Sequence, residues 1–242
     1  FFFLMIRRLP RSTPLYSSAA SDVYKSQTKG DSWVIGDTVN ASIGQGFTLS
    51  SPLQLAVMTA RIATNRAVVP RLIKSIDGVE QPSGAGEPLG KNENNMRQVR
   101  KGMYSVVNDR RGTGYRSRVI AEGVRMAGKS GTSQVRNITA AERARGVSRN
   151  EDLPWERRDH ALFVAFAPYD KPRYAVSVLV EHGGGGSTAA APIARDVMLQ
   201  AIYGGEPPLE AYPTADRGRI AEQQKALRAI QPQADFSGKD QA

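Results

Sequence analysis

Residues 129–132, Lys129-Ser130-Gly131-Thr132, combine side chains that suit acyl-transfer chemistry. A lysine ammonium can attract an anionic group and assist proton movement. Two hydroxyls can bind a carboxylate, and glycine lets a substrate backbone approach closely. A backbone N–H in this stretch could stabilise an oxyanion. A Lys-Ser/Thr-Gly triplet also arises by chance, as a lysine entering a turn, so the surrounding elements must decide between the two interpretations.

Other residues with chemical potential fit structural roles better. His182 could be a general base, but it ends an apolar run and precedes four glycines, so we expect a structural histidine. Those glycines, residues 183–186, lack the spacing of a phosphate-binding loop and predict a flexible loop that borders the site. The arginines of residues 136–158 alternate with acids, which favours a solvated loop over a nucleic-acid patch. With no cysteine and two distant histidines, no typical zinc centre is expected.

Two apolar runs after the tetrad predict the strands that would support it. Residues 160–167 and 174–181 flank the turn residues Pro168-Tyr169-Asp170-Lys171-Pro172, which is the pattern of a β-hairpin. Residues 189–203 then predict a helix that covers the sheet. The apolar residues that lead into Lys129 predict a further strand.

Two amphipathic helices are predicted before the tetrad. Ser50-Ser51-Pro52 has helix-start chemistry and opens an apolar-periodic segment over residues 53–64. Met96, Val99, Met103 and their successors recur at helical spacing, so their apolar stripe is expected to be core. Residues 36–46 predict turns, 68–76 a strand or extended connector, and 77–91 a loop. The expected order is helix, helix, strand with the tetrad, strand, strand, helix, which is an α+β arrangement.

Composition sets broad limits. The chain has 242 residues, 40% hydrophobic and 23% charged, as expected for one soluble globular domain. Its 33 Lys and Arg against 23 Asp and Glu give a net charge of +10, which suggests an anionic partner without identifying it. No stretch approaches the ~20 apolar residues that span a bilayer. As written, the sequence is expected to carry no export signal or anchor.

Both ends of the chain differ from the middle. Residues 1–27 show no helical or alternating period and resemble the translation of a sequencing-library adapter, so we expect them to be non-native or unstructured. Residues 28–204 are expected to form the partial domain. Residues 205–242, rich in Pro, Ala, Gln and mixed charges, predict a disordered tail.

The ordered motifs resemble the transpeptidase domain of the elongation-specific class B penicillin-binding proteins. Besides the tetrad, the likeness lies in Ser42 to Gly46 with its following helix start, in residues 163–168, and in Glu181 to Ser187. It covers about residues 30–204. The resemblance implies the C-terminal half of a fold shared with serine β-lactamases, with the third active-site motif on the edge strand of an antiparallel sheet beneath a C-terminal helix.

The resemblance also implies roles for the tetrad. Lys129 and Thr132 would be catalytic, with Lys129 beside the attacking serine and the Thr132 N–H as an oxyanion donor. Ser130 and Thr132 would bind the carboxylate of a terminal D-alanine or of a β-lactam, and Gly131 would make room for the substrate backbone. No metal or organic cofactor is implied.

Two motifs of the family lie outside the tetrad's neighbourhood. Ser26-Gln27-Thr28-Lys29 matches S-x-x-K by letter, but no apolar helix follows it, and it stands only about a hundred residues before Lys129. Ser148-Arg149-Asn150 matches S-x-N, yet it follows the tetrad although the family places this motif before it. We interpret both matches as chance. The nucleophilic serine is therefore expected to be absent from this chain, and the chain alone to be inactive.

The parent protein is expected to be a peptidoglycan D,D-transpeptidase of cell-wall elongation. The resemblance implies an inner-membrane anchor, a periplasmic catalytic domain, and a membrane glycosyltransferase as partner. Within the same chemistry, a D,D-carboxypeptidase or serine β-lactamase is the alternative. From another class, the charge of +10 leaves open a binding module for nucleic acid or an anionic wall polymer.

Overall fold

The computed structural model describes residues 25–27, 29–42, 44, 46, 50–71, 73–81, 86–136 and 138–230. Its centre is a three-stranded antiparallel sheet of β3 (Ala127–Ser133), β4 (His160–Ala167) and β5 (Tyr174–Val180), in the order β3-β4-β5. The predicted hairpin is confirmed, and the tetrad lies on the edge strand β3. Lys129 lies opposite Val164 and Gly131 opposite Leu162.

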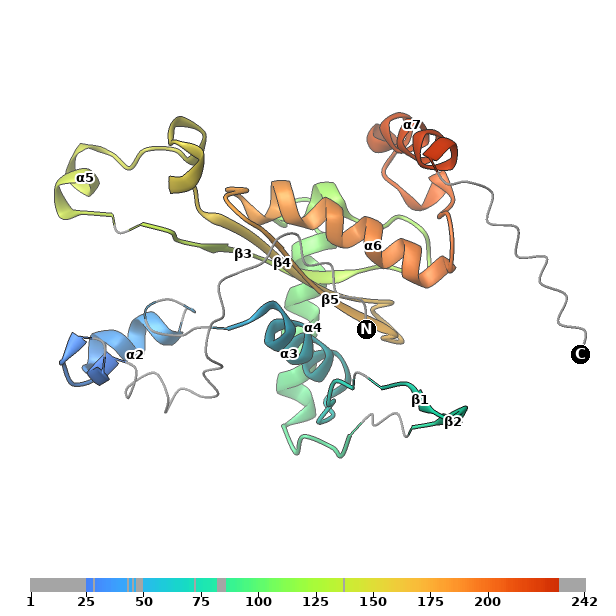
Figure 1. Cartoon of the computed structure of the whole chain (residues 1–242), viewed down its shortest axis with the longest axis horizontal. Coiled ribbons are helices and arrows are strands. Elements are labelled where there is room, and N and C mark those ends of the chain that lie inside the picture. The colour runs from blue at the N-terminus through green and yellow to red at the C-terminus, as the bar shows by residue number, and fades with distance from the viewer. Residues whose placement is uncertain are drawn as a thin grey trace, which may run out of the picture.

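Helices cover both faces of this sheet, as Figure 1 shows. Helix α6 (Ala191–Tyr203) lies on one face and α3 (Pro52–Thr64) on the other. Helix α4 (Glu93–Asn108) packs against the edge strand β3 and contributes Val107 to the core on the α6 side and Met103 to the core on the α3 side. Side chains alternate along β4, so that Phe163 packs on the α6 side while Val164 and Phe166 pack on the α3 side. Because both faces are buried, β4 and β5 are mostly apolar, with His160 and Ser177 as the polar exceptions. The α+β prediction with a covering C-terminal helix is confirmed.

The start of α3 follows the predicted cap chemistry. The Ser51 hydroxyl accepts from the Gln54 N–H at 3.3 Å, and the Gln54 side chain accepts from the Ser51 N–H at 2.7 Å. This reciprocal pair satisfies two N–H groups that the first helical turn leaves without partners. The helix ends at Asn65, whose left-handed backbone (φ 53°) lets its N–H reach the Arg61 carbonyl.

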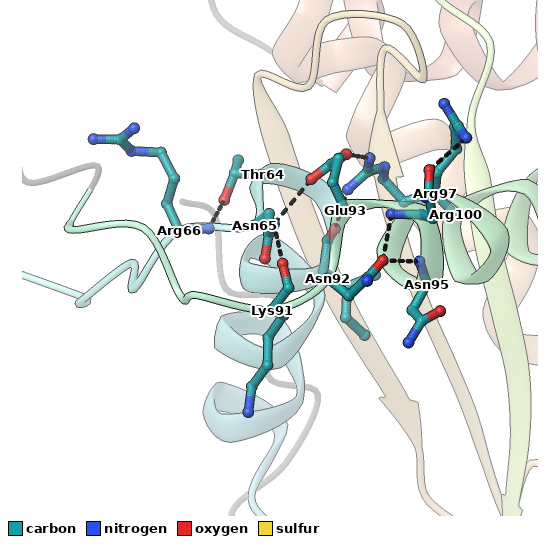
Figure 2. A network of polar contacts seen from close by, with 11 residues as sticks. Thr64, Asn65, Arg66, Lys91, Asn92, Glu93, Asn95, Arg97 and Arg100 are labelled. Atoms are coloured by element: carbon teal, nitrogen blue, oxygen red, sulfur yellow. Dashed lines mark hydrogen bonds and ion pairs between the residues drawn. The ribbon is translucent and has the colours of Figure 1, made fainter.

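A polar network joins the end of α3 to the start of α4 (Figure 2). The Asn65 amide donates to the Lys91 carbonyl at 3.2 Å and to the Glu93 carboxylate at 2.9 Å. Glu93 also pairs with Arg100, seven residues further along α4, and Arg100 donates to the Ile62 carbonyl at 3.3 Å. The network therefore fixes α4 against α3, and α4 in turn packs against β3.

The C-terminal segment corrects a prediction. Residues 205–230 are ordered, with a short 3₁₀ turn at Leu209–Ala211 and the helix α7 (Thr214–Ile230). Ile220 of α7 is buried in the core, and Arg195 of α6 pairs with Asp216 at 2.6 Å. Burial raises the pKa of Tyr212, in the turn before α7, to about 12. Predicted disorder is wrong for residues 205–230, because a few buried side chains and the ion pair of Arg195 with Asp216 are enough to dock a largely polar helix. Residues 231–242 lie outside the described residues.

Short elements complete the described chain. Helix α2 (Ile35–Ser42) stands where turns were predicted. Of the strand or extended connector predicted over residues 68–76, only β1 (Ser75–Ile76) is strand, and it pairs with β2 (Val79–Glu80), which lies in the predicted loop. The charged excursion between β3 and β4 holds helix α5 (Ala140–Arg145) and 3₁₀ turns at Asn150–Asp152 and Trp155–Arg157. A further 3₁₀ turn lies at Tyr115–Ser117, and a π-helical turn at Gly186–Ala190 leads into α6.

The N-terminal boundary differs in part from the expected one. Residues 25–27 are helical, and Lys25 pairs with Asp37 at 2.7 Å, whereas residues 1–27 were expected to be unstructured. Residues 1–24 lie outside the described residues. Within the described part of the chain, no helix combines the length and apolarity needed to cross a bilayer.

Candidate functional site

The tetrad lies on the open edge of the sheet. One side of β3 pairs with β4, and its other side pairs with no described strand. Lys129 and Thr132 are exposed, and Ser130 is half-buried. Because side chains alternate along a strand, Ser130 and Thr132 share one face, and the Lys129 ammonium, on the other face, donates to the Ser130 carbonyl at 2.6 Å. An open edge can pair with an extended peptide through its backbone N–H and C=O groups.

Close packing behind β3 holds the tetrad in place. A Cβ atom at Gly128 would lie 2.6 Å from the ring of Phe163 and 2.7 Å from the Val164 carbonyl oxygen. Phe163 itself is fully buried. Glycine just before Lys129 is therefore required for the ring to fill the space under the strand.

The glycine run after β5 also packs on β3. A Cβ atom at Gly186 would lie 2.1 Å from the Leu162 carbonyl oxygen and 2.4 Å from that of Gly131. The Gly184 N–H donates to the Asp159 carbonyl at 2.9 Å. The predicted position beside the site is confirmed, but Gly186 is buried and serves as a contact surface for the strand.

Thr113 belongs to the site and was missed by the sequence reasoning. Thr113 lies in the connection from α4 to β3, and its hydroxyl oxygen lies 3.0 Å from that of Ser130. The signal available in the sequence was Gly112-Thr113-Gly114, a hydroxyl between two glycines directly after a predicted helix. Nothing in that local pattern indicates which strand the hydroxyl meets.

The contacts of His182 are those of a structural residue, as expected. Its N–H donates to Nδ1 of His160 at 2.9 Å, and its own Nδ1 lies 2.8 Å from the Arg158 carbonyl oxygen. The Trp155 ring packs against the His182 ring at an interplanar angle of 58°, with centroids 4.4 Å apart. Burial, followed by the neighbouring His182, lowers the pKa of His160, so this imidazole is neutral and accepts the backbone hydrogen bond.

Acids partner two arginines in the excursion between β3 and β4. Arg136 pairs with Glu142 at 2.7 Å, which raises the pKa of the arginine and lowers that of the glutamate. Arg149 lies 3.8 Å from Glu151. These pairs fit the solvated loop that the sequence predicts. Among the described residues, no cluster of three or more His, Cys, Asp or Glu could hold a metal ion.

The two sequence matches to family motifs, Ser26 to Lys29 and Ser148 to Asn150, make no described hydrogen bond to the tetrad. The Asn150 side chain closes its own loop, accepting from the Asp159 N–H at 2.9 Å and donating to its carboxylate at 3.3 Å. The Ser26 carbonyl accepts from the Gly30 N–H at 3.0 Å, and Lys29 is exposed. Interpretation of both as chance matches stays a prediction.

Comparison with known families identifies the arrangement. Residues 18–199 match the penicillin binding protein transpeptidase domain. The peptidoglycan D,D-transpeptidase MrdA of Haemophilus influenzae is 40% identical over 188 residues, which cover 74% of this chain and 28% of that protein. MrdA of Acinetobacter baumannii is 36% identical over 174 residues, covering 69% of this chain and 25% of that protein.

Solved structures agree with the sequence relatives. PBP2 of Helicobacter pylori, in complex with MreC, aligns with a TM-score of 0.60 at 33% identity, over 76% of this chain and 30% of that one. PBP2 of Pseudomonas aeruginosa, in complex with WCK 5153, aligns with a TM-score of 0.58 at 32% identity, over 81% and 38%. The chain thus spans well under half of the length of these relatives.

Proposed function

The chain belongs to the penicillin-binding protein transpeptidase domain family, and from this we propose that it is part of a peptidoglycan D,D-transpeptidase of cell-wall elongation. The observation that carries the proposal is the tetrad on an open sheet edge, backed by Gly128 and Gly186. An edge of this kind can align a peptide as an added strand. Relatives named as D,D-transpeptidases at 40% and 36% identity support the same activity.

The proposed reaction is acyl transfer through a serine ester. A serine hydroxyl attacks the carbonyl of the penultimate D-alanine in a stem peptide, losing its proton to a neighbouring base. The tetrahedral intermediate collapses, the peptide C–N bond breaks, and the terminal D-alanine leaves as the protonated amine. An acceptor amine from a second strand then attacks the ester, forms the new amide and releases the serine. The serine comes from a part of the domain outside these 242 residues.

Each residue of the tetrad has a proposed role. The Lys129 ammonium attracts the anionic end of the donor and favours the proton movements at the serine. Ser130 and Thr132, on one face of β3, donate hydrogen bonds to the carboxylate of the terminal D-alanine or of a β-lactam. The Thr132 N–H is one donor of the oxyanion hole, a group whose loss costs roughly a hundredfold to a thousandfold in turnover. Gly131 leaves room for the substrate backbone.

The proposed setting is the periplasmic side of the inner membrane. The anchor and the nucleophile would be supplied by segments outside these residues, and a membrane glycosyltransferase would deliver nascent strands. The Helicobacter pylori relative forms a complex with MreC, which supports placement in a multiprotein wall-building assembly. The proposed chemistry requires no cofactor.

Labelling of the intact protein by a fluorescent penicillin tests the proposal. Covalent labelling is expected, and Lys129→Ala should reduce its rate by a hundredfold or more on the scale of lost catalytic groups. Ser148→Ala, in the charged excursion, is the matched control and should label normally. The 242-residue chain alone should not label, and labelling at Ser26 would overturn both the motif assignment and the assigned source of the nucleophile.

Product analysis separates the transpeptidase from its hydrolytic alternatives. With lipid-linked pentapeptide strands and a glycosyltransferase present, crosslinked dimers are expected. Release of D-alanine with only tetrapeptide products would instead show a carboxypeptidase. Turnover of the penicillin itself would show a β-lactamase.

A further inference from the structure

Thr113 is the one residue outside β3 whose side chain makes a described hydrogen bond to a side chain of the tetrad. Its hydroxyl oxygen lies 3.0 Å from the Ser130 hydroxyl oxygen, and either group could be the donor. Thr113 is exposed, so this contact is not a consequence of core packing around its side chain.

The backbone on both sides of Thr113 is fixed to the end of α4. The Gly112 N–H donates to the Asp109 carbonyl at 2.9 Å, and the Gly114 N–H donates to the Val106 carbonyl at 2.9 Å. A Cβ atom at Gly112 would lie 2.2 Å from the Val106 carbonyl oxygen. Because glycine has no Cβ atom, the backbone at Gly112 can pack directly against the Val106 carbonyl oxygen, and this contact fixes the backbone next to Thr113.

The same frame holds the partner of Thr113. The Asn108 amide, at the end of α4, donates to the Met126 carbonyl at the entrance to β3, at 2.9 Å. The Gly114 backbone also lies beside the Phe163 ring, which supports β3 from below. The backbones that carry the two hydroxyls are therefore held relative to one another by the end of α4.

The direction of the hydrogen bond between the two hydroxyls follows once Ser130 donates to a bound carboxylate. Each hydroxyl has one proton, and an ionised carboxylate only accepts. If Ser130 donates to the carboxylate, its oxygen is left to accept, and Thr113 is placed to donate to it. Donation from Thr113 polarises the Ser130 hydroxyl and strengthens its bond to the anion.

We propose that Thr113 is a positioning residue that orients the Ser130 hydroxyl toward the carboxylate of the donor peptide or β-lactam. The inference rests on the proposed function, because it assigns Thr113 to the carboxylate subsite of that reaction. It also explains why a hydroxyl stands between two constrained glycines at this point of the chain. In this proposal Thr113 acts through its hydrogen bond to Ser130 and not by binding the carboxylate itself.

Acylation kinetics of the intact protein test the inference with two ligands. Benzylpenicillin presents a carboxylate, and its methyl ester does not. Thr113→Val keeps the side-chain shape without the hydroxyl, and Thr113→Ser keeps the hydroxyl. We expect Thr113→Val to lower the second-order acylation rate constant for benzylpenicillin by up to about tenfold, the upper end for one neutral hydrogen bond, and to leave the ester within about twofold. Thr113→Ser should stay within about twofold of wild type with both ligands.

A double-mutant cycle with Ser130→Ala gives a second, independent readout. If Thr113 acts through Ser130, Thr113→Val should have no further effect on benzylpenicillin in the Ser130→Ala background. Equal losses for acid and ester, additive losses in the cycle, or a wild-type rate in Thr113→Val would overturn the inference while leaving the proposed function intact. Failure of the wild-type protein to be acylated would overturn both.

Discussion

Gly186 lies directly against the backbone of Gly131, the glycine of the tetrad. A side chain at position 186 would come within 2.4 Å of the Gly131 carbonyl oxygen and 2.1 Å of that of Leu162. These two atoms belong to the opposed pair Gly131 and Leu162 in the β3–β4 ladder. The loop after β5 therefore sets the position of the edge strand at the middle of the proposed site.

Gly186→Ala should displace β3 at Gly131. Overpacking a well-filled interior costs about 1–3 kcal/mol, so the urea midpoint should fall accordingly. In the intact protein, acylation by a fluorescent penicillin should slow as well, because the displaced strand carries the carboxylate-binding hydroxyls. Gly185→Ala is the matched control, since its Cβ would meet only the Thr188 hydroxyl at 3.7 Å. Equal effects of the two substitutions would contradict this account.

Glu93→Gln should remove a pH-dependent contribution to stability at the α3–α4 junction. Hydrogen bonds from Arg100 and Asn65 lower the pKa of Glu93 below its usual range. A carboxylate with a lowered folded-state pKa stabilises the fold above its unfolded pKa of ~4.3, and the contribution disappears as the pH falls through the folded value. Urea unfolding of the two proteins should therefore differ at pH 7 and converge in acid. Glu222→Gln, on the exposed surface of α7, should leave the midpoint unchanged at both pH values.

Asp216→Asn should loosen α7 from α6. Arg195 is 1% exposed and pairs with Asp216 and with Asp196, so the substitution leaves a buried guanidinium with one acid in place of two. We expect a loss of about 1–3 kcal/mol, the range for a buried hydrogen bond to a charged group. Faster proteolysis within residues 214–230, followed by mass spectrometry, would locate the effect.

The control for α7 is an ion pair on its surface. Arg228→Gln breaks a contact with Glu206 in which both side chains are largely exposed, 65% and 44%. Exposed pairs of this kind contribute about 0–1 kcal/mol. If Asp216→Asn were no more destabilising than Arg228→Gln, the buried pair would not be what docks the helix.

His160→Asn should change the slope of stability against pH in the range below the ordinary histidine pKa of ~6.5. Burial and His182 lower the pKa of His160 below its unfolded value, although Glu181 and Asp159 act in the opposite direction. The unfolded chain therefore binds more protons in this window, and wild-type stability should fall as the pH falls through it. Asn can accept the His182 N–H through its side-chain oxygen without titrating. An unchanged slope in the variant would show that another group governs this window.

Local patterns in the sequence were enough to predict the hairpin of β4 and β5, the cap of α3, the covering helix α6 and the strand that carries Lys129. These features depend on turn residues, capping side chains and apolar runs that act over a few positions. The tetrad could be proposed for the same reason, because its four residues are contiguous.

Tertiary structure alone decided the rest. The contact of Thr113 with Ser130, the packing of Gly186 on Gly131, and the docking of α7 through Arg195 and Asp216 join residues that are distant in the chain. Such contacts depend on how the helices and the sheet pack together, and no local propensity encodes that packing. The sequence by itself thus determined which residues could perform the chemistry, and the fold decided what holds them in position.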